Sequence, residues 1–519
     1  MNAPDQAPSN LTGRVVRGVS LAGSGFILAR TISLTTYIVL ARLVTPTELG
    51  QFTAGSILVG IGLLLAGSGM QAALIQRRDR LEEAAATAVI ATVLAGLVIA
   101  LIGWAVSPLI GSLFDSSTVA AVAAAMAPVL FLQSTRVVPN ALLQRRFSFL
   151  RRLVVEPASA IAFGIGAIVA TSSGLGVWGL VIGQYAAVTT DLILSWGLVQ
   201  WRPKLSLASF AMWRELVRYG RHVLAGTTVR RVGDRIPILA TGAFVGNAAL
   251  GQLQYANRIV TTPFAMLVTG VSYVVFPAFA RISQDGRRLK VALLKSLRWT
   301  AMVSMPIGLI LIALGEPLAI LVFGERWSEA GEATRALCLF IPAQAIAAVL
   351  GEGFKGAGQP PERTKVNIAG VLAGVATMAA LLPLWGLIGV AIGISVDAIV
   401  SAGFSISRTR RALGVPPREA LGVLAAPFFA ALLMVTVLLP VELLLVDAAS
   451  RGTALGLLLL AGEGALGAAI YAAALRVLAP GLGREFRGLI RKGRDRDGNK
   501  KASGDEEKLE AESERAEPI

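Results

Sequence analysis

The sequence predicts an all-α, polytopic membrane protein with about fourteen transmembrane helices. Hydrophobic residues make up 55% of its 519 residues, charged residues make up 15%, and the mean hydropathy is +0.68. One soluble core cannot hold that apolar surplus. Apolar stretches also recur at lengths near the roughly 20 residues that a helix needs to cross a bilayer.

The predicted spans are the apolar runs between polar breaks, and their ends are good to about four residues. They are 15–41, 50–75, 84–110, 118–139, 153–172, 175–199, 218–245, 250–279, 297–315, 333–354, 366–384, 386–407, 420–440 and 453–475. These spans divide the chain into helical bundles and connecting or terminal segments. These are a cytoplasmic N-terminus (1–14), an N-terminal six-helix bundle (15–199), a cytoplasmic linker (200–217), a C-terminal six-helix bundle (218–407), two additional helices (420–475) and a charged, disordered cytoplasmic tail (476–519).

The positions of the basic residues support this topology. If both termini are cytoplasmic, the inner connections hold many Lys and Arg residues, whereas the outer ones contain only Arg42, Arg326, Arg335 and Arg451. This asymmetry is what the positive-inside rule predicts, and it requires the charged seventh span, 218–245. The formal net charge of +16 therefore reflects membrane topology, and we expect no nucleic-acid partner.

Zinc and disulfide chemistry are excluded by composition. The chain has one cysteine, Cys338, and one histidine, His222, so neither an intramolecular disulfide nor a Cys/His zinc site can form. We predict no metal site, no catalytic residues and no cofactor.

A short internal repeat relates the first and seventh spans. Leu21-Ala22-Gly23 matches Leu224-Ala225-Gly226, and the Leu-Gly-Gln-Phe sequence at 49–52 matches Leu-Gly-Gln-Leu at 250–253. Six spans separate the two copies, so both run the same way through the membrane. This spacing favours a duplication whose two halves are related by an axis along the membrane normal.

Ionisable residues inside the predicted spans are the candidate site. Each costs at least about 2.5 to 3.5 kcal/mol at the bilayer centre, so such residues should face water, a partner or a ligand. The six arginines are Arg30, Arg136, Arg230, Arg231, Arg235 and Arg258, and the three aspartates are Asp191, Asp234 and Asp397.

The seventh span concentrates these charges on one helix. Arg231 and Arg235 are one turn apart, and Asp234 lies four residues after Arg230. Arg30 and Arg231 also occupy comparable places in the two repeats, so facing halves would direct guanidinium groups to one cavity. Guanidinium binds phosphate oxygens in a bidentate manner, which predicts an anionic substrate such as a phosphate or pyrophosphate. The alternative is that the charges only pair with one another or extend to the interface.

Three sequence elements resemble a known transporter family. They are the stretch LARLVTPTELG at 40–50, ALIQRRD at 73–79 and LQRRF at 143–147. The Arg-Leu-x-x-Pro-x-x-x-Gly and Gln-Arg-Arg elements resemble the polysaccharide-type, Wzx-like flippases of the multidrug/oligosaccharidyl-lipid/polysaccharide exporter superfamily. The resemblance extends over spans one to twelve.

That resemblance implies two pseudo-symmetric six-helix bundles around a central cavity, with two further C-terminal helices. It also implies a bacterial inner-membrane flippase, not an enzyme, that moves an undecaprenyl-diphosphate-linked oligosaccharide to the periplasmic leaflet by alternating access. The implied partners are this cargo, membrane lipids, and a polysaccharide polymerase with its chain-length machinery.

Two alternatives stay open at this stage. One is a multidrug exporter of the same superfamily, and the other is a membrane glycosyltransferase or polysaccharide polymerase. Asp191, Asp234 and Asp397 could bind a coupling proton or sodium ion, or they could neutralise nearby arginines; the sequence leaves both readings open. In the flippase reading, Arg30, Arg231, Arg235 and Arg258 hold the diphosphate.

Overall fold

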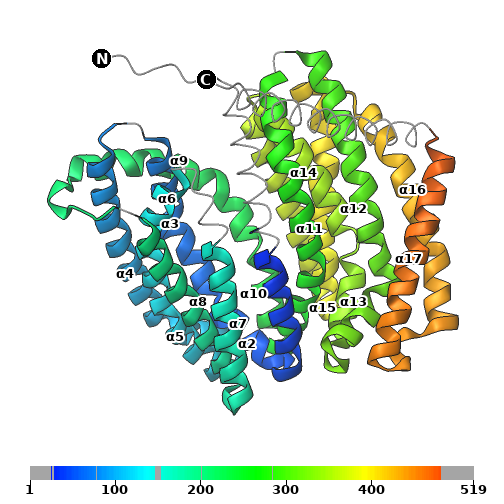
Figure 1. Ribbon diagram of the computed structural model, residues 1–519, viewed down its shortest axis with the longest axis horizontal. Coiled ribbons are helices and arrows are strands. Elements are labelled where there is room, and N and C mark those ends of the chain that lie inside the picture. Colours follow the sequence, from blue (N-terminus) through cyan, green and yellow to red (C-terminus); the bar gives the residue numbers. More distant parts are fainter. Residues whose placement is uncertain are drawn as a thin grey trace, which may run out of the picture.

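The computed structural model describes Gly25 and residues 28–77, 79–145, 154–199, 201–282 and 285–480. Helices of the N-terminal half lie on one side of the molecule and most of those of the C-terminal half lie on the other, whereas the helix Phe210–Gly233 begins beside the N-terminal half (Figure 1). The two halves meet around α2 (Pro46–Gly55) and α11 (Asn247–Ile282), which pack against each other. The predictions for residues 1–14, for most of the tail and for the start of the first span concern residues outside the described ones.

Every predicted span corresponds to helix in the described part of the chain. Residues 28–43 form the described portion of the first span. The remaining helices of the N-terminal half are α3 (Ile57–Gln76), α4 (Leu81–Leu113), α5 (Ser117–Thr135), α6 (Val137–Arg145), α7 (Glu156–Ala170) and α8 (Val177–Leu198). Those of the C-terminal half and the additional pair are α9 (Phe210–Gly233), α10 (Ile236–Phe244), α12 (Gly286–Phe323), α13 (Ser328–Ala336), α14 (Phe340–Gly356), α15 (Pro360–Leu413), α16 (Pro417–Val441) and α17 (Thr453–Leu478).

The described residues do not confirm the count of fourteen spans. Within the described residues, eight helices are long and apolar enough to cross a membrane, or nine if the bent α13–α14 pair is one span. Other predicted spans are divided between two helices, such as α2 with α3 and α9 with α10, and α15, which counts once, holds two predicted spans on either side of Gly386. The all-helical membrane class is therefore confirmed, whereas the count of fourteen is not.

Two helical hairpins show the internal repeat directly. α7 and α8 are joined at Gly176, whose φ and ψ are 51° and −123°, and α15 folds back on itself at Gly386, whose φ and ψ are 49° and −121°. Only glycine adopts such a left-handed conformation without strain. Three glycines repeat at a constant spacing of 210 residues, namely Gly176, Gly179 and Gly183 with Gly386, Gly389 and Gly393. The two halves thus contain the same hairpin with the same turn.

The two arms of the α15 hairpin pack against each other through glycines, among them Gly374 and Gly393. A Cβ built on Gly374 would lie 2.8 Å from Asp397 Cβ, and one on Gly393 would lie 2.3 Å from Met378 Cγ. The two arms therefore approach too closely for a larger residue.

We expect Gly393→Val to destabilise the protein by about 1–3 kcal/mol, because the added methyl groups overpack this interface. Thermal unfolding in detergent measures the effect. Gly403→Val on the same arm is the matched control, since a Cβ at Gly403 meets no atom within 4 Å. Equal unfolding temperatures for the two variants would contradict the packing argument.

The contact between α2 and α11 is symmetric about the repeat. A Cβ at Gly50 would lie 1.7 Å from the Asn247 carbonyl oxygen, and one at Gly251 would lie 2.0 Å from the Pro46 carbonyl oxygen. Gly50 and Gly251 are equivalent in the repeat, and so are Pro46 and Asn247, because both pairs are 201 residues apart. Equivalent glycines therefore let the two helix starts cross with their backbones in contact.

Hydrogen bonds between the halves reinforce this crossing. We call the region formed by residues 37–55, 247–260 and 321–330 the closed end. Trp327 Nε1 donates to the Ala41 carbonyl at 2.9 Å, and Tyr255 Oη donates to the Tyr37 carbonyl at 2.8 Å. Trp327 and Tyr255 are fully buried, and their ring centroids are 4.0 Å apart.

Arginines extend the same contact. Arg42 donates to the Leu321 carbonyl at 3.1 Å, and Arg326 donates to the Val44 carbonyl at 3.3 Å. In the sequence, Trp327 and Arg326 belong to the longest predicted outer connection. The structure instead uses them to join the two halves.

Candidate functional site

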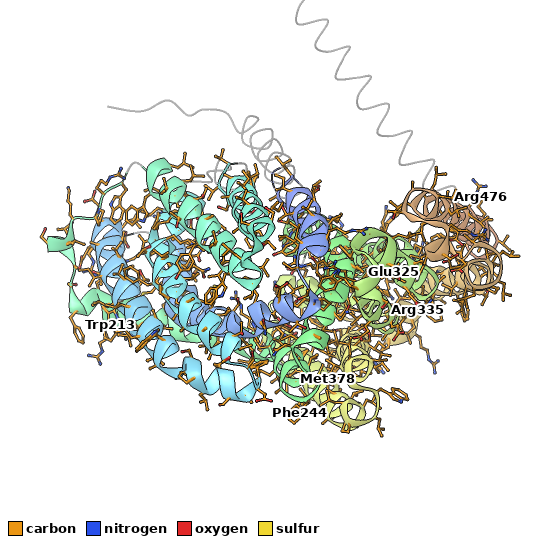
Figure 2. All side chains as sticks on the ribbon, turned by 90° about the horizontal axis from the view of Figure 1, so that it is seen from below. Trp213, Phe244, Glu325, Arg335, Met378 and Arg476 are labelled. Carbon is orange, nitrogen blue, oxygen red and sulfur yellow. The ribbon has the colours of Figure 1, made fainter. Side chains whose placement is uncertain are left out.

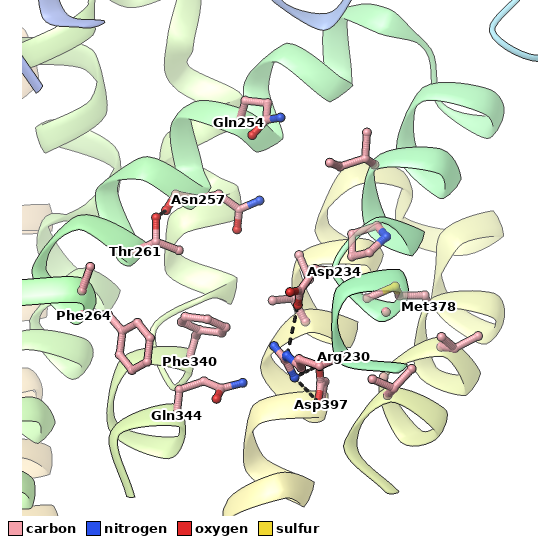
Figure 3. A pocket seen from close by; sticks show the side chains of 18 of the residues that line it. Arg230, Asp234, Gln254, Asn257, Thr261, Phe264, Phe340, Gln344, Met378 and Asp397 are labelled. Carbon is pink, nitrogen blue, oxygen red and sulfur yellow. Dashed lines mark hydrogen bonds and ion pairs between the residues drawn. The ribbon is translucent and has the colours of Figure 1, made fainter. Parts of the chain in front are cut away.

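A cavity of about 520 Å³ lies against the C-terminal half, and charged residues of the predicted site line it. Arg30, from the helix over residues 28–43, Arg230, Asp234 and Asp397 line it. They come from three widely separated parts of the sequence, and the repeat-related hairpin of α15 supplies Asp397. Figure 3 shows Arg230 between the two aspartates, facing the polar and aromatic side chains of α11 and α14.

Arg230 is held by both aspartates. Its Nη1 lies 2.9 Å from Asp397 Oδ2, and its Nε lies 3.1 Å from Asp234 Oδ1. Ser401 Oγ also donates to Asp397 at 3.2 Å. The Asp397 side chain is 16% exposed and that of Asp234 is 50% exposed. Asp397 is thus the buried anchor of the cluster, and Asp234 is the carboxylate more open to the cavity.

A break in the seventh span positions Asp234. α9 ends at Gly233 and α10 begins at Ile236, with Pro237 in the first turn of α10. Proline has no backbone N–H and is favoured in a first turn, which explains a new helix start here. The expected single cationic face is therefore wrong, because Arg231 and Arg235 do not lie on one continuous helix.

The opposite wall of the cavity is polar and aromatic. Gln254, Asn257 and Thr261 follow one another along α11, and Phe264 packs edge-on against Phe340 of α14. Sequence reasoning selected charges and missed this wall. The signal was available, because the three polar residues have the spacing of one helix face within an apolar span.

A second cavity, of about 240 Å³, shares Phe264 and Gln344 with the first. Arg363, Asn367 and Ser405 are among its lining residues. Arg363 forms a salt bridge with Glu352 at 3.3 Å. Polar groups therefore continue from the main cavity toward the end of the molecule that holds the start of α15.

Four of the six predicted arginines, Arg136, Arg231, Arg235 and Arg258, do not line the main cavity. Arg231 is exposed, and Arg235 lies against Gly60 of α3, where an added Cβ would come within 2.5 Å of the guanidinium carbon. The Arg258 guanidinium carbon is 3.0 Å from the ring centroid of Tyr37, a cation–π contact that joins the two halves.

Arg136 and Asp191 form a separate ion pair in the N-terminal half. Asp191 also accepts a hydrogen bond from Ser195 at 2.8 Å, and Ser195 in turn lies 3.0 Å from the Asn140 side-chain oxygen. This network does not line the main cavity. Each half therefore holds an arginine–aspartate pair, with the aspartate on the second arm of its repeated hairpin, but only the pair of the C-terminal half borders the cavity.

The charge of the main cavity differs from the expectation of an arginine-rich chamber. Its lining contains two arginines and two aspartates. An anion binds most favourably to such a site when a carboxylate is neutralised, because the guanidinium then has free hydrogen-bond donors for the anion. The geometry can therefore link anion binding to cation uptake.

Comparisons with known proteins agree with this fold. A family model described as polysaccharide biosynthesis protein matches residues 39–332, more than half of the chain. The teichuronic acid biosynthesis protein TuaB of Bacillus subtilis (strain 168) is 24% identical over 62% of this chain and 67% of its own length. The succinoglycan biosynthesis transport protein ExoT of Rhizobium meliloti (strain 1021) is 23% identical over 56% of this chain. The lipopolysaccharide biosynthesis protein WzxC of Escherichia coli (strain K12) is 24% identical over 64% of it. The alignments span 59 to 67% of these relatives' lengths.

Solved structures share the architecture. The lipid II flippase MurJ in an inward closed conformation superimposes with a TM-score of 0.74 at 15% identity, over 89% of this chain and 99% of that one. An inward-facing MATE family multidrug transporter of the MOP superfamily gives a TM-score of 0.56 at 17% identity, over 77% and 98% of the two chains. The chain therefore shares the fold of these membrane proteins.

Proposed function

The chain belongs to the polysaccharide biosynthesis protein family, and from that membership we propose that it flips a lipid-diphosphate-linked oligosaccharide across the bacterial inner membrane. The observation that carries the proposal is the main cavity, where Arg30 of the N-terminal half and Arg230 of the C-terminal half border one space. Guanidinium groups fit diphosphate oxygens, and an undecaprenyl chain on the cargo would stay in the lipid.

Both termini are cytoplasmic in this proposal, so the closed end faces the periplasm. The basic inner connections support that orientation. The cargo headgroup enters from the cytoplasmic leaflet while Trp327 and Tyr255 keep the two halves joined at the other end. Separation of the closed end then releases the oligosaccharide on the periplasmic side, where a polymerase with its chain-length machinery takes it up. No bond of the cargo is broken.

Arg230 couples cargo to a driving ion. Asp234 and Asp397 hold its guanidinium when the cavity is empty, and neutralisation of a carboxylate by a proton or sodium ion frees donors for the diphosphate. Loss of the ion restores the carboxylates as competitors and expels the cargo. Asp191, in the other half, keeps Arg136 in place and is not part of this exchange.

We expect Arg30→Ala to reduce flipping about 10- to 100-fold, since charge-assisted hydrogen bonds contribute about 1.5–3 kcal/mol each. Arg30→Lys should keep part of the activity, because lysine retains the charge without the bidentate geometry. The measurement is translocation of a polyprenyl-diphosphate oligosaccharide by purified protein in vesicles. Arg231→Ala is the matched control, as Arg231 is exposed and outside the lining.

Three results would overturn the proposal. One is full flipping by Arg30→Ala. Another is equal transport of a monophosphate-linked oligosaccharide, which would remove the diphosphate as the recognised group. The third is transport of cationic drugs without transport of the oligosaccharide, which would favour the multidrug exporter.

A further inference from the structure

The two additional helices, α16 and α17, carry a buried pair of acidic residues that the cavity does not use. α17 lies at the edge of the molecule farthest from the N-terminal half. Figure 2 shows its Arg476 on this side of the molecule and Trp213 of α9 on the opposite side. The two helices form an antiparallel hairpin. A Cβ on Gly467 would lie 2.7 Å from Leu438, and one on Gly456 would lie 2.5 Å from the Ala448 carbonyl oxygen.

That register places Glu463 of α17 opposite Glu442, the residue that follows α16. In an antiparallel pair, each step forward along one helix matches one step back along the other. The contacts of 438 with 467 and of 448 with 456 therefore place 442 opposite 463. The Glu442 carboxyl group is also the titratable group that interacts with Glu463. The hairpin therefore brings two carboxyl groups together inside the protein.

Both carboxyl groups are shielded from solvent, but only one has a hydrogen-bond donor. Glu463 is 5% exposed and Glu442 is 4% exposed. Both Glu442 oxygens accept from the Ala448 backbone N–H, at 3.1 and 3.3 Å. Neither Glu463 oxygen has a hydrogen-bond partner among the described residues.

We propose that Glu463 and Glu442 form a proton-binding site, in which Glu463 holds the proton and Glu442 is the carboxylate beside it. Two adjacent carboxylates cannot both be ionised in a buried site, because desolvation and mutual repulsion oppose the second charge. The Ala448 N–H already donates to Glu442, so we assign the proton to Glu463, whose oxygens have no donor among the described residues. A protonated Glu463 also supplies the donor that its neighbour can accept.

No other described charge compensates the pair. Asp447 and Arg451 lie in the connection between α16 and α17, where both are exposed, and Arg451 donates to the Val446 carbonyl. On α12, Glu316 is engaged by Arg335 at 2.7 Å. Tyr471 of α17 donates its hydroxyl to the Met302 carbonyl. A proton is therefore the neutralising cation that these surroundings leave to the pair.

The hairpin also touches the closed end, which gives the proton a route to the transport cycle. Gly456 packs against the Leu321 side chain of α12, and the Leu321 carbonyl accepts the hydrogen bond from Arg42 of the N-terminal half. Ionisation of Glu463 would push the hairpin arms apart beside this contact. Through this contact, the protonation of Glu463 would affect the segment that joins the two halves.

Infrared spectroscopy of the full-length protein in lipid tests the site without any transport measurement. At mildly acidic pH we expect Glu463→Gln to remove the carbonyl band of one protonated carboxyl group, and in the wild type that band should fade as the solution is made alkaline. Glu419→Gln is the matched control, because Glu419 of α16 forms a salt bridge with Lys290 at 2.7 Å.

Thermal unfolding supplies a second readout. Alkaline solution should lower the unfolding temperature of the wild type, since a proton held only in the folded state stabilises at low pH and not at high pH. Glu463→Gln should remove that part of the dependence. An unchanged infrared band in Glu463→Gln would overturn the proposal, as would stabilisation by sodium ions at alkaline pH that Glu463→Gln abolishes. Both readouts are independent of cargo, so they can fail while the proposed flippase function holds.

Discussion

Replacing Arg230 with alanine is expected to abolish cargo flipping and to destabilise the protein. The substitution leaves Asp397, whose side chain is 16% exposed, without the guanidinium 2.9 Å away. Removing one partner of a buried ion pair costs about 3–5 kcal/mol, because the remaining charge is left uncompensated. Loss of transport by this variant alone could therefore reflect poor folding.

The double variant Arg230→Ala with Asp397→Asn separates the two effects. It removes both charges, so we expect most of the thermal stability to return while flipping stays at least about 100-fold reduced. The matched control is Arg136→Ala with Asp191→Asn, which removes the corresponding pair outside the cavity. Recovery of flipping in the double variant would contradict the role of Arg230 in cargo binding.

The second large effect is expected at the crossing of α2 and α11. In Gly251→Val the new side chain would occupy the space of the Pro46 carbonyl, which lies 2.0 Å from the Cβ position. Backbone cannot move aside as a flexible side chain can, so the halves should separate at the closed end. We expect flipping to fall at least about tenfold, because a protein that cannot close cannot complete the cycle.

Labelling from the periplasmic side measures this opening. A protein with Cys338→Ser and Thr261→Cys carries its thiol in the main cavity, and a membrane-impermeant maleimide should label it faster when Gly251→Val is added. Gly422→Val on α16 is the control, as a Cβ there meets nothing within 4 Å. If Gly251→Val left both labelling and flipping at the control level, the crossing would not be a gate.

The sequence was sufficient for the class of fold and for much of the helix positions. Hydropathy reports burial in lipid along each segment, so every predicted span has a helical counterpart in the described residues. It does not report breaks such as the one between Gly233 and Ile236, where a proline and the surrounding packing end one helix and begin another. Such breaks are one reason why the described helices do not confirm the predicted count of about fourteen spans.

The charged residues of the site were found, but their partners were not. Insertion cost identifies Arg30, Arg230, Asp234 and Asp397 without reference to structure, and all four line the cavity. Whether an arginine faces the cavity, Tyr37 or Gly60 depends on helix rotation, which the tertiary packing sets. The same criterion of a charge within a span would also have selected Glu463.

The reciprocal contact of Gly50 with Asn247 and of Gly251 with Pro46 has an evolutionary consequence. A surface that meets its own repeated copy through equivalent residues is the kind of contact that joins two identical subunits. The ancestral half-length protein would then have been a homodimer held together by this contact between equivalent residues. The present chain would be its covalently joined descendant. A break in the linker at 200–217 should therefore let two separately expressed halves reassemble.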